Sequence, residues 1–162
     1  MLTLNQFLDK FGEDTTSNFD LLKWSKQFGI KNFHYAMRDE TKNLKKIRKL
    51  PIFIIANYET SKEDGSHHVA LYKDIDHAYY FNSFGTQPFK EAIDFLGPHY
   101  IYSTFQIQKM TQKCRGQLSI YFLYCLHNGK IYYDTVFDML LWSLKIYYPS
   151  LLPLTNWASD SM

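Results

Sequence analysis

Apolar residues recur along this chain at two spacings, one typical of helices and the other of strands. The N-terminal segment 2–11 has the three- and four-residue spacing of an amphipathic helix. A second helix is expected to start at Asp20 and to stop near Gly29, because glycine commonly ends a helix. The polar, basic segment 31–49 predicts a loop with a helical turn. The apolar positions of the first helix are Leu4, Phe7, Leu8 and Phe11.

The middle of the chain has the pattern of strands. After Pro51 the run IFIIANY is almost continuously apolar, which indicates a strand buried on both faces. In the stretch from Gly65 to Gly85, VALY and HAYYF are separated by the polar residues KDID and predict a hairpin. PFKEAIDFL predicts a short helix that ends at Gly97, and the alternating segment 100–108 predicts another strand.

The strongest helical signal follows the polar break KMTQKCRG. The helix has one apolar face and should end at 127–129, and a last helix runs through Val136 and Ser143 before a tail with Pro149 and Pro153. Helices, then four strands interrupted by one helix, then helices again predict the α+β class, with a mostly antiparallel central sheet packed by helices. The apolar face is formed by Leu118, Tyr121, Phe122, Cys125 and Leu126.

Length and composition favour one globular domain. The 162 residues are enough for a substantial core, and 46% apolar with 18% aromatic residues excludes a disordered chain. We expect a helical N-terminal part over 1–50, a central core over 51–128, and a C-terminal helix and tail over 129–162.

The net charge of +2 is too small to indicate nucleic-acid binding by itself. Five basic residues are nevertheless close together, and such a cluster is either a solvated helix face or a phosphate-binding patch. The cluster consists of Lys42, Lys45, Lys46, Arg48 and Lys49.

Two cysteines, Cys114 and Cys125, cannot form a disulfide framework. The opening segment MLTLNQFLDKFGED is amphipathic and acidic, unlike a signal peptide, and the runs PIFIIA and IYFLYCL are too short to span a membrane. We therefore expect a soluble protein of a reducing compartment, in which a thiol can stay reactive.

The hairpin carries candidate chemistry. His67 and His68 precede its first strand and point to opposite faces, so only one of them can enter a given site. Asn82 closes the second strand, where its amide can orient a histidine at the start of the first. A surface hairpin with two solvated histidines is the alternative. A metal site that adds His77 and nearby carboxylates has no spacing typical of structural zinc.

Cys114 supplies a possible nucleophile. It lies at the start of the predicted helix, on the same side as the apolar face, where the helix dipole would favour a thiolate. Arg115 would be turned away and could support that charge. Gln106, Gln108 and Gln112 are within one loop's reach as oxyanion donors. Cys114 could equally be a small loop residue.

The blocks GSHHVALY, YYFNSFG, FQIQ and IYFLYCL resemble the adenovirus-type (adenain-like) cysteine proteases of viruses, virophages and virus-like transposons. The resemblance covers roughly residues 50 to 127, and FNSFG is its most specific part. It implies that His67 is the general base, that Asn82 is the orienting residue in place of the usual acid, and that Gln108 is the oxyanion glutamine. His68 stands where the family has tryptophan.

The nucleophile position departs from this pattern. Aligning FQIQ without gaps places Gly116 on the family glycine and Arg115 where the cysteine should stand. Either the loop has one extra residue and Cys114 is the nucleophile, or the nucleophile is lost and the protein binds without cleaving. Ser119 paired with Gln112 is a third option that leaves Gly116 unexplained.

The resemblance implies a cysteine endopeptidase that matures viral or virus-like capsid precursors, cutting beside small, often Gly-Gly-like, residues. The alternative is an inactive homologue that serves as a capsid-associated or protein-binding scaffold. No cofactor is required, although a peptide or DNA activator is known in the family, and the basic cluster could contact DNA weakly. We expect a monomer that contacts no membrane, within the host cytoplasm or nucleus and packaged in the virion.

Overall fold

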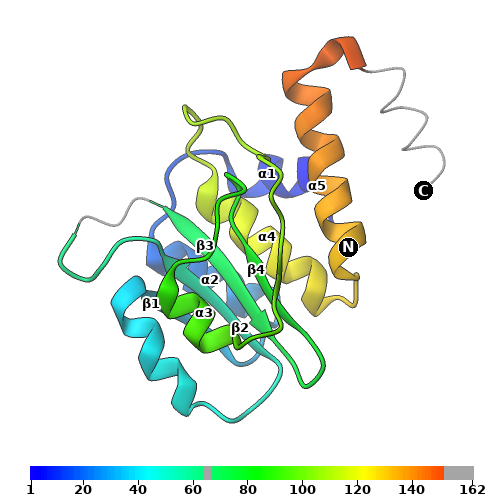
Figure 1. Ribbon diagram of the computed structural model, residues 1–162. Helices are drawn as coiled ribbons and strands as arrows, with labels where there is room; N and C mark the ends of the chain where they lie inside the picture. The colour runs from blue at the N-terminus through cyan, green and yellow to red at the C-terminus, as the bar shows by residue number, and fades with distance from the viewer. Residues whose placement is uncertain (64–66, 152–162) are drawn as a thin grey trace.

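The chain alternates helices with the strands of one central sheet (Figure 1). The elements are α1 (Leu4–Phe11), α2 (Asn18–Gln27), β1 (Phe33–Met37), η1 (Arg38–Lys46), β2 (Ile52–Asn57), β3 (His68–Lys73), β4 (Ala78–Phe81), α3 (Lys90–Leu96), β5 (Ile101–Tyr102), α4 (Arg115–His127), α5 (Tyr132–Tyr147) and η2 (Pro149–Leu151). The computed structural model describes residues 1–63 and 67–151. Gly65 of the predicted hairpin stretch and Pro153 of the predicted tail lie outside these residues.

Within the described residues, five strands form a sheet in the order β1-β2-β3-β4-β5. The pairs β2–β3 and β3–β4 are antiparallel, whereas β1 and β5 join the two edges in parallel. The α+β class and the antiparallel hairpin of β3 and β4 are therefore confirmed.

Each face of the sheet carries a hydrophobic core. Along β2, Phe53 and Ile55 contribute to the core that α1, α2, α4 and α5 complete, while Ile52 and Ile54 contribute to the core under α3 and η1. Every residue of β2 is buried, which confirms the two-sided burial expected from its apolar run. Helices α3 and α4 accordingly lie on opposite faces of the sheet (Figure 1).

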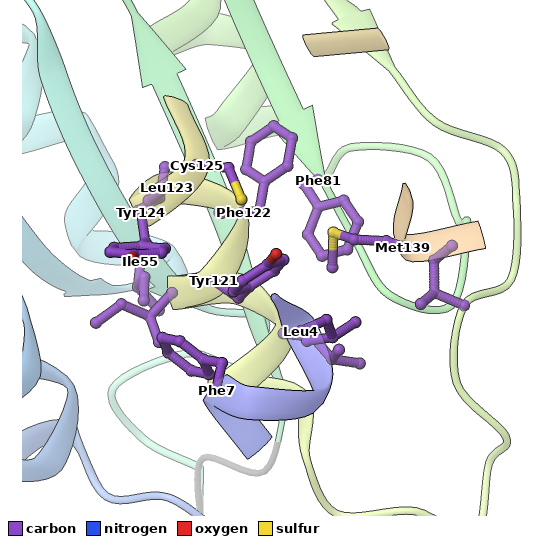
Figure 2. Packing of buried hydrophobic residues seen from close by; sticks show 14 of the residues in the cluster. Leu4, Phe7, Ile55, Phe81, Tyr121, Phe122, Leu123, Tyr124, Cys125 and Met139 are labelled. Atoms are coloured by element: carbon purple, nitrogen blue, oxygen red, sulfur yellow. The ribbon is translucent and has the colours of Figure 1, made fainter. Parts of the chain in front are cut away.

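Helix α4 is more deeply enclosed than its sequence pattern predicts. All residues from Gly116 to Cys125 are buried, so the expectation of one apolar face is wrong. Figure 2 shows the reason, since side chains from α1, the sheet and α5 surround the helix. Among them are Phe7, Ile55, Phe81 and Met139.

The segment 31–49 contains the expected helical turn, η1, and also a strand, β1, that was not predicted. Strand β1 lies at the sheet edge with β2 as its one strand neighbour, and η1 follows it directly. An edge strand needs no continuous apolar run, because much of it stays half-exposed, and β1 has one buried residue, Ala36.

The prediction of a strand over 100–108 is also wrong for most of that segment, because the observed strand β5 covers Ile101–Tyr102. The backbone N–H groups of Ile107 and Gln108 both donate to the carbonyl oxygen of Ser83, at 2.8 and 3.2 Å. These contacts hold the chain against the turn that follows β4 instead of extending the ladder of β5. No helix within the described residues is long and apolar enough to cross a membrane.

Candidate functional site

The hairpin brings His67 and Asn82 together at one end of the sheet. The two residues precede β3 and follow β4, and His67 Nε2 lies 2.8 Å from Asn82 Oδ1. Asn82 is held in this orientation, because its Oδ1 also accepts from the Phe84 N–H at 3.0 Å and its Nδ2 donates to Thr86 Oγ1 at 2.6 Å. His67 Nε2 is therefore the donor in the pair, and Nδ1 of the neutral ring keeps its lone pair.

Aromatic rings enclose the imidazole of His67. Phe84 stacks on it with a centroid distance of 4.8 Å, and Tyr58 lies 6.0 Å away. Burial lowers the pKa of His67, and the hydrogen bond to Asn82 opposes that shift in part. In the described part of the chain, His67 Nδ1 is buried and has no hydrogen-bond partner.

His68 points to the opposite face of the sheet, as the strand alternation predicts. Its Nε2 lies 3.3 Å from Tyr35 Oη, and its own carbonyl oxygen accepts a hydrogen bond from Ser119 Oγ at 3.1 Å. Burial lowers the pKa of His68 to about 4. Ser119 is itself fully buried, so a role as nucleophile is not favoured by its position.

Gln108 is buried beside the turn after β4. Its Oε1 accepts from Ser83 Oγ at 2.5 Å, and its Nε2 donates to the carbonyl oxygen of Gln112 at 3.0 Å. The side chain that the resemblance assigns to the oxyanion site thus orders the loop before α4. Its oxyanion role stays a prediction.

The Cys114 thiol is part of the hydrophobic core. The residue caps α4, is 0% exposed and packs in the cluster shared by α1, α4 and α5. Burial raises the pKa of Cys114 to about 11, and the charge of Glu13 acts in the same direction. The expectation that the helix dipole would yield a thiolate is therefore wrong here, because desolvation of the sulfur outweighs it.

Arg115, the first residue of α4, faces the site instead. Its guanidinium carbon lies 5.3 Å from the centroid of the Phe84 ring, whose neighbour is His67. Its charge lowers the pKa of both His67 and His68. Arg115 was expected to turn away from the core-facing side of the helix that carries Cys114, and it does so, towards Phe84.

Close packing fixes the start of α4. A Cβ atom on Gly116 would come within 2.8 Å of Thr16 Cβ, so this position accepts little beyond glycine. Thr16 Oγ1 donates to Gln117 Oε1 at 2.7 Å, and Gln117 Nε2 donates to the Asp14 carbonyl oxygen at the same distance. These contacts determine which residue of α4 turns towards His67.

Sequence reasoning missed several of these positions. Tyr58 contacts His67, Thr86 contacts Asn82 and Ser83 contacts Gln108, and the last pair is separated in the chain by α3 and β5. Thr86 is the one of these residues that the sequence could have indicated, because a spacing of four residues from Asn82 suits a polar contact across a turn.

The structure also bears on the metal site and on the basic cluster that the sequence suggested. Over residues 1–63 and 67–151, no three His, Cys, Asp or Glu side chains are grouped to hold a metal ion. The five basic residues of the Lys42–Lys49 cluster are all exposed, on η1 and the segment after it. Contact of this cluster with DNA stays a prediction, which a salt titration of DNA affinity would test.

The fold is similar to that of a known protease. The pS273R protease of ASFV matches this chain with a TM-score of 0.53 and 15% sequence identity. The match covers 78% of this chain and 65% of the protease, so this chain spans less than two thirds of that protein. No protein family and no curated protein matches the sequence. The likeness establishes a protease-like α+β fold.

Proposed function

We propose that this protein binds polypeptide segments at the His67–Asn82 site without hydrolysing them, as a protein-binding scaffold on a cysteine-protease fold. Capsid proteins of a virus or a virus-like element are the partners that the sequence resemblance implies. The observation that carries the proposal is that, at the start of α4, Arg115 and not Cys114 is directed towards the candidate site. Arg115 lies over the ring of Phe84, which stacks on His67, while the Cys114 thiol is enclosed in the core.

The chemistry of the two side chains supports a protein that does not cleave. A guanidinium has no nucleophilic atom and stays protonated in proteins, so Arg115 cannot attack a peptide carbonyl. A thiol with a pKa of about 11 is almost entirely protonated at neutral pH, and attack requires the thiolate. Cys114 would also have to leave the core to reach a substrate.

The surroundings of His67 support binding. Tyr58, His67, Phe84 and Arg115 are each half-buried, so part of each residue is accessible to a ligand. Aromatic rings and arginine are the residues that most often supply binding energy at protein interfaces.

Hydrolysis by Cys114 is the second candidate, and the His67–Asn82 hydrogen bond favours it. A histidine oriented through Nε2 presents Nδ1 to a nucleophile, as a general base requires. In this reading a different packing of the loop before α4 would expose Cys114 to His67. Gln108 and the Cys114 backbone N–H would then bind the oxyanion, and the substrates would be capsid precursors.

A peptidase assay separates the two candidates. The wild-type protein, Cys114→Ala and Arg115→Cys would each be incubated with a fluorogenic peptide ending in Gly-Gly-aminomethylcoumarin and with the capsid precursor. We expect no cleavage by the wild type or by Cys114→Ala. Arg115→Cys should gain activity, because a thiol would then stand next to His67.

Cleavage by the wild type that is lost in Cys114→Ala would overturn the proposal and establish the endopeptidase. Binding is measured on the same proteins by fluorescence anisotropy with labelled short peptides. Absence of peptide binding would remove the scaffold function as well.

A further inference from the structure

A cavity lies at the opposite end of the β3–β4 hairpin from His67 and Asn82. It is bounded by the turn between these strands, by β5 and by the segment that joins α4 to α5. Its volume is about 540 Å³, within the range of small-ligand sites. We call it the tyrosine cavity, because four tyrosines line it. They are Tyr72, Tyr79, Tyr132 and Tyr133.

The rings at the tyrosine cavity are nearly parallel to one another. Tyr79 stacks on Tyr72 with a centroid distance of 5.6 Å and an interplanar angle of 14°, and on Tyr132 at 4.7 Å and 26°. His77 lies 5.6 Å from Tyr79 at 25°. A planar group extends such a stack, whereas a tetrahedral ammonium group does not. Tyr132 is 5% exposed, and within the described residues its buried hydroxyl has no hydrogen-bond partner.

Asp74 places a carboxylate at the tyrosine cavity. Its oxygens accept from Tyr72 Oη at 2.8 Å and from the backbone N–H groups of Asp76 and His77 at 2.8 and 2.6 Å. They also lie 3.2 and 3.3 Å from His77 Nδ1. Among residues 1–63 and 67–151, no lysine or arginine forms an ion pair with Asp74. The carboxylate is therefore well ordered, and a cation that enters the cavity meets its charge.

The other walls of the tyrosine cavity favour the same sign of ligand charge. Lys130 contributes a cation to the lining, but it is paired with Asp138. Leu126 in the last turn of α4 and Gly129 just beyond it also line the cavity. The C-terminus of a helix carries partial negative charge, and α4 has 13 residues. The cavity thus combines stacked rings with a field that favours a positively charged donor of hydrogen bonds.

From this combination we infer that the tyrosine cavity binds an arginine side chain of a partner polypeptide, with the guanidinium stacked on the tyrosine rings and paired with Asp74. The guanidinium is planar, carries a positive charge and donates several hydrogen bonds, so it matches all three properties of the walls. A lysine has the charge without the plane, and a glutamine has the plane without the charge. The inference goes beyond the proposed function, because this cavity shares no residue with the His67–Asn82 site.

Three capped pentapeptides test the inference. Each has two glycines on both sides of a central arginine, citrulline or lysine. Citrulline keeps the planar shape of arginine and removes its charge, whereas lysine keeps the charge and removes the planar group. In an NMR titration of protein labelled on its aromatic rings, the arginine peptide should shift the signals of Tyr79 and Tyr132. Its affinity should be about tenfold or more above that of either other peptide.

Asp74→Asn should lower the affinity for the arginine peptide about tenfold, because it removes the charge that pairs with the guanidinium. Asp76→Asn is the matched control, since Asp76 is an exposed acid of the same turn and does not line the cavity. It should bind the arginine peptide like the wild type. The comparison of the three peptides on the wild-type protein tests the inference independently of how well Asp74→Asn folds.

Equal affinity for the arginine peptide and either of the other two would overturn the inference, and so would unchanged binding by a folded Asp74→Asn protein. The absence of any shift at Tyr79 and Tyr132 would overturn it as well. If the arginine peptide shifted the rings of His67 and Phe84 instead, the inference would fail while peptide binding at the His67–Asn82 site stood. Conversely, shifts at the tyrosine cavity alone would support the inference without supporting the proposed function.

Discussion

Cys114 and Arg115 are adjacent in the sequence and lie in opposite environments. Cys114 is 0% exposed in the core between α1, α4 and α5, and its pKa is raised to about 11. Arg115 is half-buried on Phe84 and lowers the pKa of His67. These two adjacent residues therefore lie on different sides of α4. One side is excluded from solvent and the other side contacts the candidate site.

The difference teaches that residue type alone does not determine reactivity at a helix N-terminus. A charge near a helix terminus at the surface typically gains up to about 1 kcal/mol from the helix dipole. Desolvation of a fully buried thiol can exceed that, and the raised pKa of Cys114 indicates that it does so here.

The largest expected effect is on stability, where removing an aromatic ring from the core should cost more than removing one from the candidate site. Phe122 is fully buried and stacks on Phe81 at 4.8 Å, whereas Phe84 is half-buried. We expect Phe122→Ala to lower the free energy of unfolding by about 3–5 kcal/mol, because it leaves a cavity in the core. Phe84→Ala should cost roughly 1 kcal/mol. Urea denaturation measures both, and equal losses would contradict the division into a core side and a site side.

The second-largest expected effect is the loss of stability at low pH that His68 causes. The pKa of His68 falls from 6.5 to about 4 on folding, so between these values the unfolded chain binds a proton that the folded chain excludes. Stability contributed by neutral His68 is complete above pH 6.5 and is lost as the pH falls towards 4, by about 3 kcal/mol in total. Electrostatic interactions with His67 and Arg115 add to this shift.

His68→Phe is the control, because it removes this titration and keeps an aromatic ring in the core. Denaturation at pH 7 and at pH 4.5 should show a smaller loss of stability for His68→Phe than for the wild type. The same loss in both proteins would mean that His68 is protonated in the folded state.

Third in size is the reactivity of the thiol. Raising the pKa of Cys114 from 9.0 to about 11 lowers its thiolate fraction about a hundredfold. Iodoacetamide should therefore modify Cys114 in the folded protein at least a hundredfold more slowly than a free cysteine at neutral pH. In the double variant Cys114→Ala, Arg115→Cys, the new thiol should react faster. Rapid modification of Cys114 in the wild type would place it on the site side instead.

The smallest expected effect is on the pKa of His67. Asn82→Asp puts a carboxylate against His67 Nε2–H, which should raise the pKa of His67 by about one unit or more. Asn82→Ala should lower this pKa, because the hydrogen bond to Asn82 raises it. An NMR titration of the histidine rings measures both variants. No change in either would show that the pair does not persist in solution.

The sequence by itself determined the elements that have a strong local pattern. The spacing of Leu4, Phe7, Leu8 and Phe11 predicts α1, and the apolar run after Pro51 predicts β2 with burial on both faces. The antiparallel hairpin also follows from its turn, and with it the meeting of His67 and Asn82, because both residues lie at the ends of paired strands.

Tertiary structure decided the rest. Strand β1 and the non-strand path of 103–108 depend on hydrogen bonds to partners distant in the chain, such as Ser83, which local periodicity does not report. The same holds for the choice between Cys114 and Arg115. Successive helix residues are turned by about 100° from each other, so the rotation of α4 selects which of the two faces His67. Packing of α4 against α1, the sheet and α5, with Thr16 against Gly116, sets that rotation.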